Sequence, residues 1–181
     1  MTYAKMLGVT RHDASTAERY LVRPAVAADL DAIAGFEVDI ARASFGDDAI
    51  VDAAFHRRRV AGALAKPGEI MLVAVAATAT DDPVGWAWMS ERTNSLTGER
   101  YGNFRSLATA SGDPRRPVGE LLMTAILAAA DKAGMSHLSG KVNASNLGMR
   151  ALYRAFGFTA THLTMERRTG RTETPGETGH T

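Results

Sequence analysis

The sequence predicts a single α/β domain with a mixed, mostly antiparallel sheet and helices on both faces, in the order β-α-α-β-β-β-α-β-α-β. Stretches with helical periodicity alternate along the chain with short apolar runs of strand length. In the middle of the chain three such runs follow one another with polar turns between them, which is typical of an antiparallel meander. The helix that comes next is long enough to make its flanking strands parallel. A length of 181 residues, 45% of them hydrophobic, suffices for one core.

The first third of the chain is expected to hold a strand and two helices. Residues 20–23 are a short strand that Pro24 closes. An amphipathic helix then opens at Asp29 and carries side chains on successive turns at Leu30, Ile33, Ala34 and Glu37. A second helical stretch covers residues 48–64 and ends before a proline-glycine pair, which is a common stop signal.

Three strands make up the expected meander. They are residues 70–75, 84–89 and 101–110, and the first of them is a nearly continuous apolar run. Residues 80–83 and residues 94–99 have the composition of turns. The three strands are therefore expected to pair in sequence order.

The last part of the chain alternates helices and strands. The expected elements are a helix, a strand, a helix and a strand, at residues 118–133, 135–142, 147–156 and 158–167. Gly134 and Gly157 stand directly after the two helices, where a residue of positive φ commonly ends a helix. Asn146 precedes the second of these helices and is an N-cap candidate.

The composition of the two ends bounds the domain. Residues 1–19 are expected to form a polar N-terminal arm, residues 20–168 the folded domain, and residues 169–181, which are almost free of apolar side chains, a disordered tail. The first residues lack the apolar stretch of a signal peptide, and no segment approaches the ~20 apolar residues of a membrane span. We therefore expect a cytoplasmic protein without a membrane partner.

Charge and cysteine content argue against several classes of function. Lys plus Arg number 21 and Asp plus Glu number 20, so nucleic acid is not an expected partner. The chain has no Cys, which removes disulfides, thiolate metal sites and a cysteine nucleophile. His137 and His162 stand alone in their segments, so no metal cofactor is expected.

A candidate anion site precedes the helix expected at residue 118. The loop before it carries glycines, prolines, Arg115 and Arg116, and the first N–H groups of a helix have no partner within the helix. A pyrophosphate placed there would meet backbone donors, the positive end of the helix dipole and two guanidinium groups. Such a loop can also be a simple connector, and the residue types alone leave both interpretations open.

A longer motif lies one strand and one helix further along the chain. Residues 146–158 resemble the signature N-x-x-A-x-x-L-Y-x-x-x-G-F of the GNAT acetyltransferase superfamily, with Met149 at the alanine position. The order of elements over residues 20–167 also resembles that superfamily. The resemblance implies a GNAT fold and direct transfer of an acetyl group from acetyl-coenzyme A (acetyl-CoA) to a primary amine of a small molecule or peptide.

The same resemblance implies which residues bind acetyl-CoA. The family usually has R/Q-x-x-G-x-G/A in the loop, whereas here Pro114 and Pro117 stand at the first and second of the specified positions and only Gly119 matches. The implied contacts come from the third meander strand, the loop, the helix start and the signature, at Leu107, Ala108, Thr109, Arg115, Arg116, Pro117, Val118, Gly119, Glu120, Asn146 and Tyr153.

Tyr153 occupies the tyrosine position of the signature, where the resemblance implies a catalytic general acid toward the leaving sulfur. A thiol pKa of ~8.5 and a tyrosine pKa of ~10 make that proton transfer feasible. The alternative is a half-buried tyrosine with a structural role. Asn146 is either a helix N-cap alone or an N-cap that also contacts the pantetheine arm.

The amine is expected to bind against the first helices and the hairpin near Asn94. The candidate substrate contacts are Phe36, Trp86, Trp88 and Glu91. The two tryptophans share one face of their strand, which suits a substrate pocket or the core. The proton of the amine would pass to a water chain, to Glu91 or to Glu37.

Other functions stay open on the sequence alone. The domain could be a GNAT-fold binding or regulatory module without catalysis, or an acyltransferase that uses a longer acyl-CoA or acts on aminoacyl-tRNA. The near-neutral charge argues against the tRNA version, because RNA binding normally calls for a broad basic face. The resemblance also leaves a homodimer open, through an exposed strand edge.

Overall fold

The computed structural model describes residues 19–112, 115–162, 164, 165 and 167. The strands found among them are β1 (Tyr20–Pro24), β2 (Glu69–Ala76), β3 (Ala79–Thr93), β4 (Arg100–Thr109) and β5 (Leu138–Gly140). The helices are α2 (Leu30–Phe45), α3 (Ala53–Ala61), α4 (Arg115–Lys132) and α5 (Leu147–Ala155), with short 3-10 turns η2 (Ala27–Asp29) and η3 (Gly46–Asp48). The predicted arm, apart from residue 19, and the predicted tail at 169–181 lie outside the described residues.

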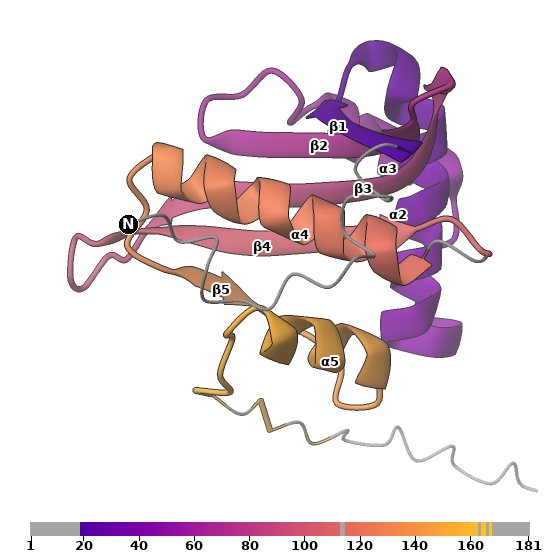
Figure 1. Ribbon diagram of the computed structural model, residues 1–181. Helices are drawn as coiled ribbons and strands as arrows, with labels where there is room; N and C mark the ends of the chain where they lie inside the picture. Colours follow the sequence, from indigo (N-terminus) through magenta and orange to yellow (C-terminus); the bar gives the residue numbers. More distant parts are fainter. Residues whose placement is uncertain (1–18, 113–114, 163, 166, 168–181) are drawn as a thin grey trace, which may run out of the picture.

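The five strands form one sheet in the order β1-β2-β3-β4-β5. The first three pairings are antiparallel and the last, β4 with β5, is parallel. In Figure 1, α4 lies across one face of the sheet and α2 and α3 lie behind the other, while α5 sits next to β5 beyond the sheet. The prediction of a mixed, mostly antiparallel sheet with helices on both faces is confirmed.

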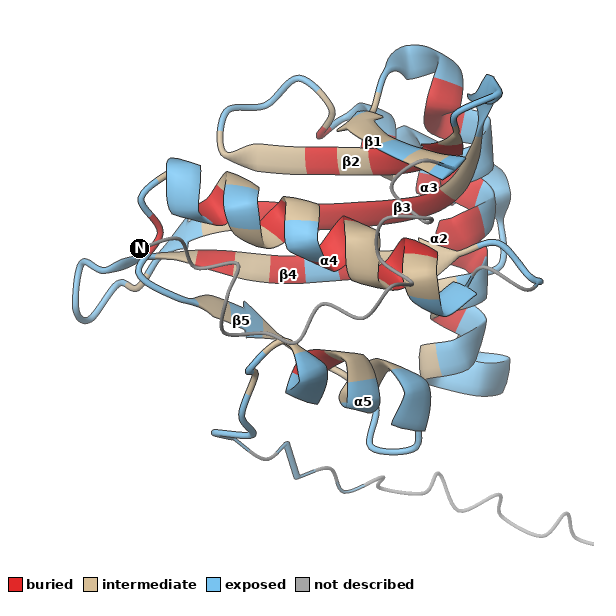
Figure 2. Ribbon diagram, in the orientation of Figure 1, coloured by how far each residue is buried: buried red, intermediate tan, exposed pale blue. Residues whose placement is uncertain are grey.

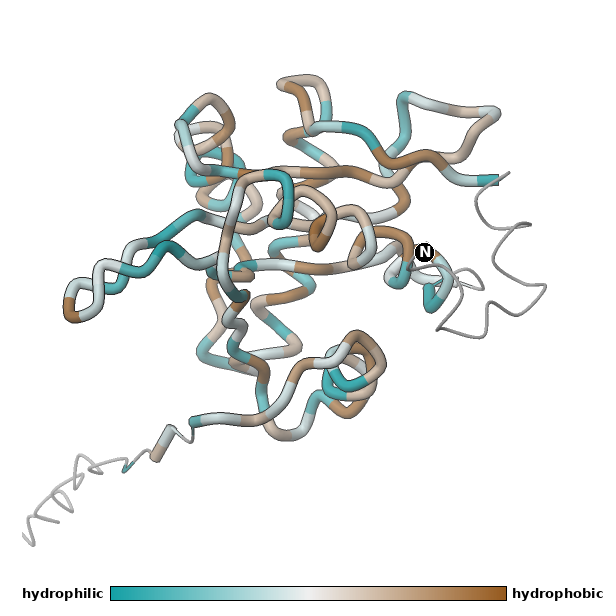
Figure 3. Tube along the Cα trace, turned by 60° about the vertical axis from the view of Figure 1, so that its left-hand side comes forward, coloured by the Kyte–Doolittle hydropathy of each residue, from teal (hydrophilic) through white to brown (hydrophobic). Residues whose placement is uncertain are grey.

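Each face of the sheet has its own hydrophobic cluster, and Figure 2 shows the buried positions running along the central strands and the inner sides of the helices. The α4 cluster includes Ala87, Met89, Phe104, Val118, Leu122 and Ile126. The α2 cluster includes Ile33, Phe36, Val60, Val73, Trp86 and Trp88. Figure 3 shows hydrophobic stretches in this layered centre and a largely hydrophilic projecting hairpin. Successive side chains of β3 therefore belong to opposite clusters, as the alternation of a strand requires.

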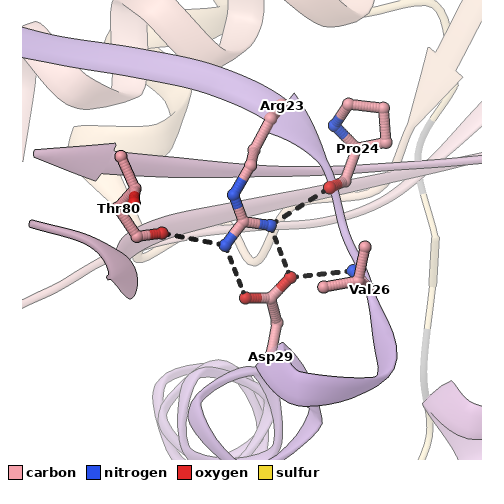
Figure 4. A network of polar contacts seen from close by, with 5 residues as sticks. All are labelled: Arg23, Pro24, Val26, Asp29 and Thr80. Carbon is pink, nitrogen blue, oxygen red and sulfur yellow. Dashed lines mark hydrogen bonds and ion pairs between the residues drawn. The ribbon is translucent and has the colours of Figure 1, made fainter. Parts of the chain in front are cut away.

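A buried ion pair fixes the start of α2, as Figure 4 shows. The Arg23 guanidinium donates two hydrogen bonds of 2.8 Å to the Asp29 carboxylate, and it also donates to the Thr80 carbonyl oxygen at 3.1 Å. The Val26 N–H donates to the same carboxylate at 2.8 Å. These bonds lower the pKa of Asp29, with the Arg23 hydrogen bond as the largest cause. They tie β1, the entry to α2 and the first residues of β3 together.

Two predicted boundaries in the first half are wrong. Residues 80–83 do not form a turn, because β3 already begins at Ala79 and the turn is at residues 77–78. The register between β2 and β3 is irregular here, with Val75 opposite Pro83, and such an irregularity accommodates a proline that cannot donate to the ladder. The second helix is confined to α3, since Asp52 caps it by accepting from the Ala54 N–H at 2.8 Å.

The predicted strands near the C-terminal end are also shorter or absent. Only Leu138–Gly140 of the predicted strand 135–142 is extended and paired. No described residue of the predicted strand 158–167 is in a strand. The Phe158 N–H instead donates to the Tyr153 carbonyl oxygen at 3.0 Å, which ends α5, and residues 159–162 that follow are exposed. A segment that buries no apolar face gains little from joining the three-residue edge of β5.

Candidate active site

A cleft of about 630 Å³ opens where β4 and β5 part. Its walls come from the C-terminal half of α2, the second half of β4, the start of α4, the residues after β5 and α5. The cleft exists because β5 pairs only with residues 102–104 of β4. From Arg105 to Thr109 the outer edge of β4 has no strand beside it among the described residues. The backbone groups on that edge are therefore open to a ligand.

A β-bulge marks the point where the two strands part. Trp88 of β3 pairs with Ser106 of β4, but Met89 pairs with Phe104, so Arg105 is an extra residue in β4. A bulge bends its strand and increases the local twist. The last pair between β4 and β5 is Phe104 with Gly140, directly before the bulge.

The start of α4 forms one end of the cleft. The helix begins at Arg115, three residues before the predicted start, and both Arg115 and Arg116 line the cleft. Arg116 also donates to Glu120 at 2.8 Å on the exposed surface. Pro117 lies in the first turn, where its missing N–H leaves no helical hydrogen bond unmade. The remaining free N–H groups and two guanidinium groups make this end suitable for an anion.

Gly119 and Val118 have different surroundings on the same turn of α4. Gly119 lines the cleft, and a Cβ built on it would lie 3.8–3.9 Å from side-chain atoms of Leu152, Leu107 and Thr109. The Val118 side chain is buried in the α4 cluster and does not line the cleft, and neither does Pro117. Any contact of Val118 to a ligand in the cleft would therefore come from its backbone.

Tyr153 lies at the other end of the cleft and is almost fully buried. Its ring packs edge-on against Phe104, with centroids 5.9 Å apart, and against Phe158 at 4.7 Å. Burial raises the pKa of Tyr153 to about 12, so its hydroxyl group stays protonated at neutral pH. No hydrogen bond joins this hydroxyl to another described residue. The phenol is thus a free donor at the edge of the cleft.

Gly140 makes room for that hydroxyl. A Cβ built on Gly140 would collide with the Tyr153 hydroxyl oxygen and lie 3.0 Å from its Cζ atom. Only glycine lets the phenol reach this position beside the end of β5, because any other residue would place a carbon there.

Asn146 caps α5, as predicted. Its Oδ1 accepts from the Met149 N–H at 3.0 Å, and the residue also lines the cleft. Its amide NH₂ has no hydrogen bond to another described residue. Both interpretations of this residue, cap and ligand contact, are compatible with its position.

The predicted substrate contacts Phe36, Trp86 and Trp88 do not line the cleft. All three are buried in the α2 cluster, because the alternation of β3 turns both tryptophans toward α2. The indole N–H of Trp86 donates to Glu37 at 2.8 Å, and that of Trp88 donates to Glu69 at 2.6 Å. The structure therefore matches the core interpretation of this pair.

The predicted proton acceptors Glu91 and Glu37 are also away from the cleft. Glu91 is opposite Gly102 near the β3–β4 turn and accepts from Arg100 at 2.7 Å, which lowers its pKa. It lines a separate hollow of about 320 Å³ beside Gly68. Glu37 is buried and accepts hydrogen bonds from Arg59 and Trp86. Neither carboxylate is open to a ligand in the cleft.

Several residues of the cleft were not predicted. They are Asp39, Ile40, Ala43 and Ser44 of α2, Phe104 and Arg105 of β4, and Lys141, Val142 and Asn143 after β5. The spacing of the α2 residues places them on one side of a helix, which is a readable signal. Nothing local in the sequence marks the bulge at Arg105, because its existence depends on the pairing of two strands.

The combination of this mixed sheet, a parted strand edge and a helix N-terminus at one cleft is that of an acyltransferase domain. A family model described as the acetyltransferase (GNAT) family matches residues 39–158, more than half of the chain. The chain therefore belongs to the GNAT acetyltransferase family, and the resemblance seen in residues 146–158 is confirmed.

Solved structures share the fold at low sequence identity. A possible acetyltransferase from Clostridium difficile 630 has a TM-score of 0.67 and 18% identity over 84% of this chain and 98% of its own. The ribosomal-protein-alanine N-acetyltransferase from Brucella melitensis biovar Abortus 2308 has a TM-score of 0.64 and 15% identity, over 83% of this chain and 99% of its own. The aminoglycoside 6′-N-acetyltransferase AAC(6′)-Ih from Acinetobacter baumannii has a TM-score of 0.64 and 12% identity, over 83% of this chain and 98% of its own. At these identities the likeness shows the fold alone.

None of the described helices has the length and apolar composition needed to cross a bilayer. Within the same part of the chain, no cluster of three or more His, Cys, Asp or Glu side chains could hold a metal ion. No curated protein sequence matches the chain significantly.

Proposed function

We propose that the protein transfers the acetyl group of acetyl-CoA directly to a primary amine of a small molecule or peptide. One observation carries this proposal. A single cleft joins an anion-binding helix start at Arg115, an open strand edge at residues 105–109 and a protonated phenol at Tyr153. These are the three features that a long anionic thioester needs at its phosphates, its amide-bearing arm and its sulfur.

The dimensions of the cleft suit such a donor. At about 3.3 Å per residue, the open edge at residues 105–109 is roughly 17 Å long. Leu107, Ala108 and Thr109 on this edge would hold an amide-bearing arm as an added strand. The diphosphate would be held by Arg115, Arg116 and the free N–H groups before Gly119. Pro117 and Val118 would take part through the conformation of their backbone and not through their side chains. Glu120 and Asn146 complete this wall of the cleft.

The residues at the reacting end have separate roles. Bound acetyl-CoA supplies an acyl thioester, whose C–S bond breaks as the bond from the amine nitrogen to the acyl carbon forms. Tyr153 keeps its proton at neutral pH because its pKa of about 12 lies far above the pH; since that pKa also exceeds that of a thiol, ~8.5, the departing thiolate takes its proton from solvent. Tyr153 therefore stabilises negative charge on sulfur as a hydrogen-bond donor from a site with little water.

The amine must lose a proton during the transfer. Among the described residues that line the cleft, the carboxylates are Asp39 and Glu120, and Glu120 is paired with Arg116. Asp39 is mostly exposed on α2 and its nearest cation, Arg42, is 3.9 Å away. We assign it, together with solvent, as the route by which the proton leaves.

Calorimetric titration tests the donor site. Acetyl-CoA and CoA should both give heat, and the double substitution Arg115→Glu and Arg116→Glu should lower the affinity at least tenfold. Replacing Arg58, an exposed arginine of α3 away from the cleft, by Glu is the matched control and should leave the affinity unchanged. If neither nucleotide gives heat, the protein is a GNAT-fold module without a donor site, and the proposal fails.

A Tyr153→Phe variant tests the reacting end. We expect kcat at pH 7 to fall by about 10² while the CoA affinity stays the same, because one preorganised donor is lost. Release of free CoA thiol measures the rate. An unchanged kcat would show that the phenol has a structural role only.

A further inference from the structure

Two side chains at the reacting end of the cleft carry charges without an acidic partner. Arg105 is the extra residue of the bulge, and Lys141 directly follows Gly140, the last paired residue of β5. Both line the cleft. Neither forms an ion pair within 4.0 Å of a described carboxylate. An uncompensated cation at a cleft wall is available for a ligand anion.

Aromatic stacking holds Arg105 in place. Its guanidinium carbon lies 4.3 Å from the centroid of the Trp88 ring. The indole N–H of Trp88 donates to Glu69, so a hydrogen bond holds the ring in its position. A guanidinium group stacked on a ring keeps its N–H edge free, and that edge matches the two oxygens of a carboxylate.

The charges around Arg105 leave a positive surplus. Besides Arg105, the nearby charged groups are Arg59, Arg92, Glu37 and Glu69. Arg59 pairs with Glu37, and Arg92 lies 3.7 Å from Glu69. Each carboxylate thus already has a guanidinium partner, and Arg105 is the third cation beside two anions.

The position of Arg105 assigns it to the amine rather than to the donor. The phosphate end of the cleft is at Arg115. It is separated from Arg105 by four residues of open β4 edge, roughly 13 Å along the strand, and by the loop that follows. Arg105 instead follows Phe104, which pairs with Gly140, the residue whose Cβ would meet the Tyr153 hydroxyl. A group that Arg105 binds would therefore lie close to the transferred acetyl group.

We infer that the acceptor is an amine whose molecule also carries a carboxylate, and that Arg105, with Lys141, binds this carboxylate. This inference rests on the proposed function and specifies its acceptor. Amino acids and peptides with a free C-terminus belong to this class, whereas polyamines have no group for the two cations. The same cations should repel a polycationic amine from the reacting end.

Matched pairs of amines test the inference, with the protein saturated with acetyl-CoA for the rates and with CoA for binding. Each common amino acid is compared with its decarboxylated amine, its α-amide and its aminophosphonate analogue, by acetylation rate and by the shift in melting temperature on binding. At least one carboxylated member should exceed its three counterparts tenfold in kcat/KM or affinity. Equal values within every pair, no binding of any carboxylated amine, or a preference for the phosphonate would each overturn the inference.

Variants of the two cations test the assignment of residues. Arg105→Gln should raise KM for the preferred amine at least tenfold with kcat changed less than threefold, and Lys141→Gln should act in the same direction. Arg105→Lys should give an intermediate KM, because it keeps the charge but loses the two-point contact. Arg58→Gln, on α3, is the control that leaves KM unchanged.

The outcomes separate this inference from the proposed function. Calorimetry with CoA on the Arg105→Gln protein should give the wild-type affinity, which also verifies that the variant is folded. If CoA binds and KM is unchanged, the carboxylate assignment is wrong and the acetyltransferase proposal stands. If the wild-type protein gives no heat with CoA, the proposed function itself fails.

Discussion

The two halves of the sheet differ in how many of their polar groups have hydrogen-bond or ion-pair partners. In the closed half, which consists of β1, β2, β3 and the helices α2 and α3, strands pair along their length. In the open half, which consists of residues 104–109 of β4 with β5, α4 and α5, only three residue pairs join the strands. The closed half has matched each buried carboxylate to donors, whereas the open half leaves a strand edge, a phenol and two cations unmatched. The closed half therefore contains the buried carboxylates with their donors, and the open half contains the groups that a ligand could pair.

The matched carboxylates of the closed half each serve several donors. Glu37 accepts from Arg59 and Trp86, and Glu69 accepts from Trp88 and Ser90. Such groups are costly to bury and are tolerated because their hydrogen bonds are complete. Removing Trp86, a donor to Glu37, should destabilise the fold without altering the cleft, whereas removing Trp88 would also release Arg105.

The largest expected effect is that of Trp86→Ala. The indole is fully buried and donates to Glu37, so its removal leaves a cavity and takes a donor from a buried carboxylate. We expect the free energy of unfolding in urea to fall by about 3–5 kcal/mol. Trp86→Phe, which keeps most of the volume, should lose less than half as much. A loss below about 1 kcal/mol for the alanine variant would contradict the division into two halves.

Asp29→Asn should have the next largest effect. The variant leaves the partly buried Arg23 guanidinium without its charged partner, and we expect a loss of about 2–3 kcal/mol at pH 7. The folded-state pKa of Asp29 is lowered, so its contribution is complete above the unfolded pKa of ~3.9 and disappears as the pH falls through the folded pKa. The difference between wild type and variant should thus shrink below about pH 4.

Asp31→Asn is the matched control for that measurement. Asp31 is mostly exposed although it pairs with Arg57 at 2.6 Å. Urea unfolding should show a loss of no more than about 1 kcal/mol, because solvent screens exposed ion pairs. Equal losses for Asp29 and Asp31 would mean that burial adds nothing to the ion pair.

Gly140→Ala should have a smaller effect on stability than Trp86→Ala and Asp29→Asn, and a clear effect on turnover. The new methyl group would collide with the Tyr153 hydroxyl, so we expect a loss of about 1–2 kcal/mol and a fall in kcat of at least tenfold. Gly35→Ala, in α2 away from the cleft and with nothing within 4 Å of the added Cβ, is the control.

A double variant shows whether the collision is the cause. Adding Tyr153→Phe to Gly140→Ala removes the oxygen that the methyl group meets, so part of the lost stability should return. Additive losses in urea unfolding would show that the glycine acts through something other than the phenol.

Much of the fold could be predicted because its signals are local. The periodicity of residues 30–37, the apolar run of residues 70–75 and the caps at Asn146 and Gly134 each lie within a few residues of sequence. The family signature likewise placed Tyr153, and the structure puts this residue at the cleft.

The rest depends on contacts between distant segments. Alternation put Trp86 and Trp88 on one face of β3, but only the packing of α2 decides that this face is core. The predicted strand after Gly157 required a long partner edge, and β5 offers three residues. Arg115 and Arg116 of the cleft were predicted, but Arg105 was missed, because it becomes prominent only through the mismatch of β4 with β3.

The single unmatched residue at Arg105 also resets the phase of β4. Before it, even-numbered residues such as Phe104 belong to the α4 cluster; after it, odd-numbered Leu107 packs there and even-numbered Ala108 packs against the α2 cluster. Deleting Arg105 would therefore make Phe104 and Ser106 neighbours opposite Met89 and Trp88, and the strand would continue regularly with Leu107 and Ala108 on their present faces. The extra residue is consequently not needed for the core pattern of β4, and what it contributes is the bend of the strand and a cation in the wall of the cleft.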